Sequence, residues 1–361
     1  MSARVDPRRM DWRAFWIRWG VTVAVIVVLA LIPQSFPAFQ VNQYSDAVTL
    51  AIAALGLNLL TGYSGQISVG HGAFFGVGAY TTAILVADHG WPYLATTAAA
   101  AIIAFVVGVF IGLPALRIKG LYLALVTLAL AVVFPQVIKR FGEVTGGTQG
   151  KQVGRFRAPD WTGMAQDQFI FYLFLAFALV AWFLVYNLVR SRVGRALISV
   201  RDNEIGAETL GVNVALYKVV TFGLSAMLAG VAGSLSVYKT GFVNSGEYSI
   251  VLSILILVAV VIGGVATIAG PAIGSYLVTF LPDWTKGYNE QLSPVIFGAV
   301  LIVLMMVAPG GIMGLLRRVR VWIGRQIGAR GDRSPPDDST PDPAVGFEPH
   351  TGGPMPDGST A

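Results

Sequence analysis

A short polar run between residues 56 and 76 carries the side chains with which this chain could bind and move a polar solute. Glycines interrupt the run, and its polar members are Asn58, Ser64, Gln66, Ser68 and His71. Backbone groups that a weakened helix leaves unpaired at membrane depth must be packed in protein or line a watery cavity. Polar side chains at that depth are functional-site candidates, so we predict that these five line a transport pathway, with a purely structural role as the alternative for any one of them. Gly72 and Gly76, which are four residues apart, instead favour close helix packing.

The residues present do not favour metal binding, cofactor binding or catalysis. The chain has no cysteine, and its histidines, His71, His89 and His350, are scattered, so we expect no metal site and no cofactor. It contains neither a His-Glu-x-x-His zinc pattern nor a nucleophile elbow, and we therefore expect no catalytic residues.

The glycine-rich stretch at residues 145–151 invites comparison with a phosphate-binding loop but does not meet its pattern. Thr145 stands where the first glycine is required, and Gln152 stands where Ser or Thr is required. We therefore predict that this chain hydrolyses no ATP itself. The residues Thr145, Gly146, Gly147 and Thr148 are expected to form an external loop, either near the mouth of the pathway or as a mere tight turn.

A second polar segment, residues 198–213, has the pattern of a short surface helix. Asp202 or Asn203 can cap its start, Glu204 suits its first turn, and Gly211 suits its C-terminal cap. Its apolar residues have nothing within the chain obliged to cover them, and they are Ile205, Ala207, Leu210 and Val212. This pattern predicts a docking helix for a cytoplasmic partner, the alternative being a solvated connection between two spans.

These segments require membrane-spanning helices to position them, because the chain is far more apolar than a soluble protein. Of its 361 residues 55% are hydrophobic and 12% are charged, and the mean hydropathy is +0.68. One span needs about 20 apolar residues, which predicts an all-α polytopic membrane protein with about ten transmembrane helices. The expected spans are roughly 17–36, 44–62, 66–87, 92–115, 120–138, 167–189, 215–238, 247–265, 270–283 and 291–309. The stretch from Gly263 to Pro271 is either a turn between two spans or a gating hinge.

Basic residues predict the orientation of the spans. Clusters around Arg8, Arg117, Arg192 and Arg317 fall on one side of ten spans, which makes that side, and both termini, cytoplasmic. The basic loop between residues 139 and 167 is an exception on the opposite side. The net charge of +6 therefore reflects membrane orientation, and we expect lipid but no nucleic acid as a partner.

The expected organisation has three parts. A basic cytoplasmic arm, residues 1–16, precedes a transmembrane domain, residues 17–316, which includes the segment 198–213. A basic stub and disordered cytoplasmic tail, residues 317–361, follow it, because the tail has too little apolar surface to offset its ordering entropy. The first span is alternatively a signal peptide.

Four long motifs occur in a fixed order along the chain. They are GLNLLTGYSGQISVGHGAFFGVGAY, VTGGTQG, GRALISVRDNEIGAETLGVNVALYKVVTFGLSAMLAGVAGSL and GGVATIAGPAIGSYL. Over about residues 45–318 the chain thereby resembles the LivM-type permease subunits of branched-chain amino-acid ABC importers. The resemblance makes the surface helix a coupling helix, with Gly206 where alanine is more usual. It implies a role in ATPase coupling for Arg195, Asp202, Glu204, Ala207, Glu208 and Gly211.

The resemblance also implies the partners and the location. It implies a bacterial inner-membrane complex with a second homologous permease, two ATP-binding cassette ATPases and a soluble extracytoplasmic substrate-binding protein. The expected function is translocation of branched-chain amino acids by alternating access, driven by the partner ATPases. Urea, short amides and aromatic acids are alternative substrates within the same family.

Two other classes of transport protein fit the residues less well. An ion-coupled transporter usually needs a carboxylate at the midplane, whereas the acids near the predicted spans sit at their ends. These acids are Asp46, Asp88, Asp167, Glu247, Asp283 and Glu290. A passive channel requires no cytoplasmic docking helix, so the segment 198–213 favours the ABC permease over both.

Overall fold

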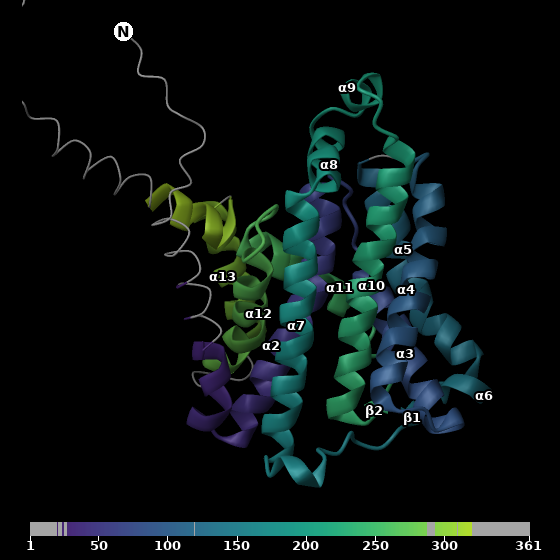
Figure 1. The fold of residues 1–361 in the computed structure, drawn as a ribbon, viewed down its shortest axis with the longest axis vertical. Helices are drawn as coiled ribbons and strands as arrows, with labels where there is room; N and C mark the ends of the chain where they lie inside the picture. The colour runs from purple at the N-terminus through teal and green to yellow at the C-terminus, as the bar shows by residue number, and fades with distance from the viewer. Residues whose placement is uncertain are drawn as a thin grey trace, which may run out of the picture. The chain divides into compact units, whose positions relative to one another are not determined.

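Apolar runs of this length fold as helices because a helix satisfies its own backbone groups where lipid offers no partner. The computed structural model describes residues 20, 24, 27–118, 120–286, 293–308 and 310–319, and these are mostly helical (Figure 1). The predicted N-terminal arm and the predicted tail beyond residue 319 lie outside the described residues. The chain divides into two compact units, Met1–Leu316 and Arg317–Ala361.

The first half of the chain builds helices in the following order. Residues 27–35 are helical and precede α2 (Ala38–Asn58), which runs on into a π-helix (Leu59–Tyr63). Then come α3 (His71–His89), α4 (Tyr93–Ala115), α5 (Leu121–Arg140) and the single turn α6 (Gly142–Thr145).

The second half begins with a short strand and a 3₁₀ turn. These are β1 (Lys151–Gln152) and residues Asp160–Thr162, followed by α7 (Gln166–Arg190), α8 (Arg192–Asp202), α9 (Glu204–Thr209) and α10 (Val214–Thr240). Strand β2 (Phe242–Val243) precedes α11 (Ile250–Gly263), α12 (Gly270–Lys286) and α13 (Ser293–Val307). The two strands pair antiparallel, with Lys151 opposite Val243.

The polytopic all-α class is confirmed, but the number of ten spans is not. By length and hydropathy five helices of the described chain can cross a membrane, and a sixth is added if the bent pair Val295–Val307 and Gly311–Val319 counts as one span. Helix α11 is apolar but has 14 residues, about 21 Å at 1.5 Å per residue, less than the roughly 30 Å of a bilayer core.

Three boundary predictions are corrected by the structure. The span expected at 66–87 begins at His71, because residues 64–70 are not helical. The span expected at 247–265 begins at Ile250, after a turn. Asp46 does not lie at a span end but inside α2, where the ammonium group of Lys239 pairs with its carboxylate at 2.6 Å.

Helix α10 forms the centre of the bundle, and it packs against α2, α3 and α4. A Cβ atom added at Gly78 would lie 1.9 Å from the carbonyl oxygen of Gly230, so α3 and α10 approach at backbone distance. Ser234 of α10 adds hydrogen bonds at 2.6 Å to Thr82 and at 2.9 Å to Thr97. Small residues and interhelical hydroxyl bonds are the usual means by which helices associate in lipid.

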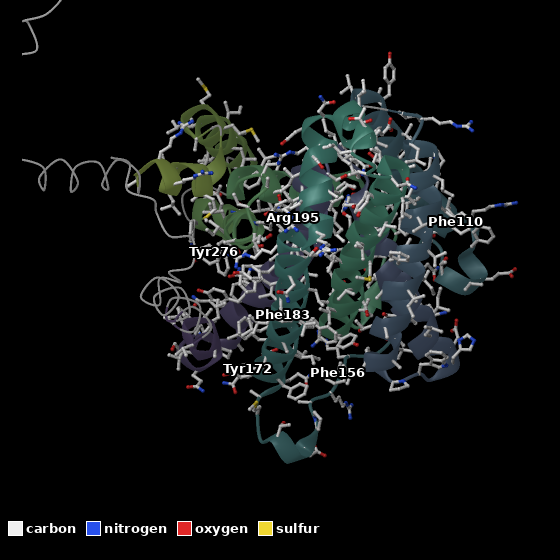
Figure 2. All side chains as sticks on the ribbon, turned by 45° about the horizontal axis from the view of Figure 1, so that its top comes forward. Phe110, Phe156, Tyr172, Phe183, Arg195 and Tyr276 are labelled. Atoms are coloured by element: carbon white, nitrogen blue, oxygen red, sulfur yellow. The ribbon has the colours of Figure 1, made fainter. Side chains whose placement is uncertain are left out.

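The outer faces of the bundle carry apolar side chains. Phe110 of α4 is 67% exposed and points away from the bundle (Figure 2). At the ends of the bundle the polar segments separate: α8 and α9 lie at one end, and α6, β1 and β2 lie at the other (Figure 1). The segment 198–213 and the loop after α5 therefore occupy opposite ends, as the ten-span topology requires.

Candidate functional site: a broken helix beside the coupling segment

The polar run is a break between two helices. We call residues 59–70 the broken segment; it consists of the π-helix that ends α2 and of the non-helical residues 64–70. Gly65 has φ +73°, a left-handed conformation that glycine adopts without strain. Within the segment the amide of Gln66 donates to the carbonyl of Leu60, and the hydroxyl of Thr61 donates to the carbonyl of Gln66. The break is thus closed on itself by hydrogen bonds.

Asn58 joins the start of this break to the turn between α11 and α12. Its side-chain amide donates to the carbonyl of Thr267 at 2.7 Å, and its side-chain oxygen accepts from the amide of Ala266 at 2.9 Å. Ala266 has φ +59° and is the one non-glycine residue with positive φ in the described part of the chain. The Asn58 side chain, which is fully buried, therefore fixes a strained turn against α2.

The turn itself agrees with one of the two sequence interpretations. Helix α11 ends at Gly263 and α12 starts at Gly270, so residues 264–269 stop one helix and start the next. Nothing in the described residues tests whether this turn also acts as a gating hinge.

His71 lies at the other end of the break in a buried hydrogen-bond chain. Its Nε2 is 2.6 Å from the hydroxyl of Ser225, and that hydroxyl donates to the carbonyl of Gly56. Since Ser225 has a single proton, His71 Nε2 must be the donor, and Nδ1 then accepts from the hydroxyl of Ser68 at 3.1 Å. These hydrogen bonds connect α2, α3 and α10 to the broken segment.

We call residues 198–213 the coupling segment, after the role that the family resemblance implies for them. Ser64 and Gln66 form the part of the break nearest to this segment. The Gln66 amide nitrogen donates to the Ser64 hydroxyl at 2.8 Å and to the carbonyl of Lys218 at 3.2 Å. Both side chains line a cavity of about 50 Å³, which is also lined by Leu123, Arg201, Glu204 and Lys218. A cavity of this size accommodates water rather than a substrate.

The coupling segment, residues 198–213, touches the broken segment directly. The Arg201 guanidinium donates to the carbonyl of Gly62 at 2.9 Å, and Gly65 packs against the Arg201 side chain. The Lys218 ammonium forms an ion pair with Glu204. Arg201 and Lys218 were missed at the level of sequence. Lys218 nevertheless carried a signal, since a lysine inside a predicted span is by default a functional candidate.

The short helix that the sequence predicts between a cap at Asp202 or Asn203 and Gly211 is α9, and residues 198–202 are the end of α8. Asn203 breaks the helix with φ −158° and ψ 103°, and its side-chain oxygen caps α9 by accepting from the amide of Gly206 at 3.0 Å. The predicted cap at Gly211 fits its φ of +81°. Asp202 pairs with Arg201 at 2.9 Å, whereas Arg195 and Glu208 are exposed.

The prediction that its four apolar residues are all uncovered is wrong for Ala207 and for Val212. The Ala207 side chain is 1% exposed and packs with Val200 and Val214, because α9 folds back on the ends of α8 and α10. Val212 is partly buried against the same cluster. Ile205 and Leu210 are 75% and 81% exposed. We call Ile205 and Leu210 the α9 apolar surface.

The loop after α5 is a tight turn. The Thr145 hydroxyl donates to the carbonyls of Ile138 and Phe141, and Gly146 and Gly147 have φ +80° and +59°. Lys151 anchors the turn by a 2.5 Å ion pair with Asp88 at the end of α3. A place near the pathway mouth for Thr145, Gly146, Gly147 and Thr148 stays a prediction.

The five predicted pathway residues thus lie in the broken segment or at its two ends, and two of them, Ser64 and Gln66, lie beside the coupling segment. All are buried, with exposed fractions of 0% for Asn58, Ser68 and His71, 2% for Ser64 and 6% for Gln66. Each is hydrogen-bonded within the chain. Whether they line the substrate pathway stays a prediction.

A bundle of apolar helices with a hydrogen-bonded break defines a polytopic membrane protein, and the comparisons identify its family. Residues 41–308 match the family described as the branched-chain amino acid transport system / permease component, and the chain belongs to that family. It is a multi-pass protein of the inner membrane with a transport role.

Several relatives carry names of the same system. The chain is 27% identical over 319 residues to the Escherichia coli protein "High-affinity branched-chain amino acid transport system permease protein LivM", covering 81% of this chain and 75% of LivM. The E. coli permease protein LivH is 26% identical over 286 residues, which are 74% of this chain and 91% of LivH. BraD of Pseudomonas aeruginosa is 25% identical, over 76% of this chain and 94% of BraD. No solved structure matches the chain.

Proposed function

We propose that this chain is a translocation subunit of an ABC importer, in which ATP is hydrolysed on separate subunits that dock on α9. The observation that carries the proposal is the α9 apolar surface, Ile205 and Leu210, which is exposed at the end of the bundle. Exposed apolar side chains on a short helix are suited to a cleft in a partner protein. Arg201 and Glu204 in the same segment contact Gly62 and Lys218, so movement of the docked helix would reach the broken segment.

The proposed assembly contains four further chains. They are a second homologous permease, two ATP-binding cassette ATPases, and a soluble extracytoplasmic protein that delivers the substrate. The mechanism is alternating access, in which closure of the ATPases displaces α9 and re-packs the helices around the break. Both termini are then cytoplasmic, which reporter fusions after Arg318 and at Trp161 on opposite sides of the membrane would test.

The substrate class follows from the names of the relatives. The LivM, LivH and BraD proteins are named for branched-chain amino acids, and we extend that class to this chain. Urea, short amides and aromatic acids are the competing substrates. Calorimetry on the soluble binding protein that acts with this chain, with leucine, urea and benzoate as ligands, separates them.

Cysteine crosslinking tests the docking directly, because the natural chain has no cysteine. In the assembled complex Ile205→Cys should crosslink to a cysteine placed in the cleft of an ATPase subunit, with a yield that changes on addition of ATP. Ala207→Cys is the matched control, two residues away in the same helix but buried, and should not crosslink. If neither Ile205→Cys nor Leu210→Cys crosslinks in any nucleotide state, residues 198–213 are a solvated connection between two spans and not a docking site.

A further inference from the structure

A second irregular segment enters the bundle from the end opposite to the coupling segment. Residues 244–249 connect β2 to α11, and the ring of Tyr248 lies 5.7 Å from that of Tyr80 and 6.0 Å from that of Phe75. Tyr80 lies nine residues before α3 ends at His89, which is about 13 Å along the helix. The segment therefore descends well inside the bundle, which explains why α11 is short.

Glu247 places a carboxylate in this segment. It is exposed, unlike its neighbour Tyr248, which is 3% exposed, and it forms no salt bridge with a described residue. The backbone holds it in place, since its amide donates to the carbonyl of Asn244 at 3.1 Å. A carboxylate at this depth is not expected to face lipid, so this face of the chain belongs to a partner or to a watery pathway.

The hydroxyl of Tyr80 is the second unusual group. Its side chain is 3% exposed, and the hydroxyl makes no hydrogen bond with any described residue. Buried polar groups are almost always hydrogen-bonded, so this hydroxyl is available to accept a hydrogen bond from a ligand or to donate one. Glu247 is the neighbour in sequence of Tyr248, whose ring lies 5.7 Å from that of Tyr80.

The packing around α3 supports a built site. The Tyr80 ring meets the ring of Phe134 at 6.4 Å and 65° as well as that of Tyr248. A Cβ atom at Gly76 would lie 2.3 Å from the Phe134 ring and 2.9 Å from Tyr248 Cβ, so glycine is required for these rings to close over α3. The result is a carboxylate and an unpaired hydroxyl beside an aromatic wall, a combination that favours an ammonium group.

We propose that the Glu247 carboxylate and the Tyr80 hydroxyl bind the protonated amino group of the transported solute on its way through this chain. The inference rests on the proposed function, that the chain is a translocation subunit, and it refines the substrate class. An ammonium group donates to both oxygens, whereas a carboxylate ligand is repelled by Glu247 and urea brings no charge to it. Amino acids are thereby favoured over aromatic acids, urea and short amides.

Uptake by the complete complex in lipid vesicles, at saturating loaded binding protein, is the first test. Glu247→Gln should lower L-leucine uptake about tenfold or more, the loss expected for one charged hydrogen bond, and Tyr80→Phe should lower it by a smaller factor. Stimulation of ATP hydrolysis should persist in both variants. Glu143→Gln, which removes an exposed acid from α6 at the same end of the bundle, is the matched control and should transport normally. Unchanged uptake in Glu247→Gln and Tyr80→Phe overturns the site and leaves the permease assignment intact.

A second test does not depend on transport. Dicyclohexylcarbodiimide modification of Glu247, read by peptide mass spectrometry on the wild-type complex, should be slowed by L-leucine and not by 4-methylpentanoate, which lacks only the amino group. Equal protection by both solutes, or by neither, overturns the ammonium site. If the wild-type complex carries urea or an aromatic acid but no amino acid, the ammonium site is wrong and the permease assignment stands. If it carries no solute in an ATP-dependent manner, the permease assignment fails, and the protection experiment alone decides the site.

Discussion

The broken segment and the α9 apolar surface reverse the usual distribution of polar and apolar groups. In the broken segment Gln66, and at its two ends Asn58 and His71, are polar, buried and hydrogen-bonded within the chain. On α9, by contrast, Ile205 and Leu210 are apolar and exposed at the end of the bundle. The polar groups of the first region find their hydrogen-bond partners within this chain, whereas no described part of the chain covers the apolar side chains of the second. Substitutions in the first should therefore damage the fold of this chain, and substitutions in the second should damage only its association with a partner.

The largest effect is expected from Asn58→Ala. The substitution leaves the amide of Ala266 and the carbonyl of Thr267 without their partner, which costs about 2–4 kcal/mol for two buried groups. Thermal unfolding of the purified chain in detergent should show a clearly lowered midpoint. Asn187→Ala, at an exposed position on α7, is the control and should unfold like the wild type. Equal stability of the two variants would mean that the break does not depend on its internal hydrogen bonds.

Arg201→Gln tests the link between the two regions. Loss of the charged hydrogen bond to Gly62 is worth roughly 1.5–3 kcal/mol, and we expect ATP hydrolysis to continue with much less transport per ATP. The measurement is the ratio of substrate imported to ATP hydrolysed in vesicles. Arg192→Gln removes an exposed arginine from α8 and should leave that ratio unchanged. A normal ratio in Arg201→Gln would show that the two regions move independently.

Leu210→Ala isolates the α9 apolar surface. Because this side chain is 81% exposed, its loss should not alter the thermal midpoint of the chain. Burial of a leucine in a partner is worth about 1.5–3 kcal/mol, so affinity for the ATPase subunits should fall by about tenfold or more. Pull-down at graded ATPase concentration measures this fall. The comparison is broken if Leu210→Ala lowers the midpoint and binds the ATPase normally.

Gly211→Ala should give the smallest effect. Gly211 has φ +81°, and a Cβ atom there would meet nothing within 4 Å, so the cost is that of the backbone alone, roughly 1–2 kcal/mol. We expect a modest loss of ATPase affinity as α9 tilts. Gly211→Asn should lose less, since asparagine tolerates the left-handed region better than alanine does. If alanine and asparagine behave alike, the left-handed cap does not orient α9.

Several features of the site could be predicted from the sequence because they depend on neighbours along the chain. The break after Asn58, the positive φ at Gly211 and the cap at Asn203 follow from glycine and from short polar side chains acting on their own backbone. The structure adds that residues 198–202 are the end of α8, so that Asn203 both ends α8 and caps α9.

Burial of Ala207 and the contacts of Arg201 and Lys218 could not be predicted in the same way. Ala207 has the same apolar character as Ile205, and only the fold-back of α9 on α8 and α10 separates a covered side chain from an exposed one. Likewise Glu247 reads as an acid at a span end. Its nearness to Tyr80 depends on how deeply residues 244–249 enter the bundle.

The sequence by itself determined that this is a helical membrane protein with a polar break and a short surface segment, because apolar run length, glycine and capping residues act over a few neighbouring positions. Tertiary structure alone decided what the polar groups bind. Arg201 and Gly62 are 139 residues apart, and Asn58 and Thr267 are 209 apart. Such pairs form only when the packing of α2, α10 and α11 brings distant segments to one depth. No local pattern encodes that depth, since the five long helices of the described chain that could cross a membrane are apolar along most of their length.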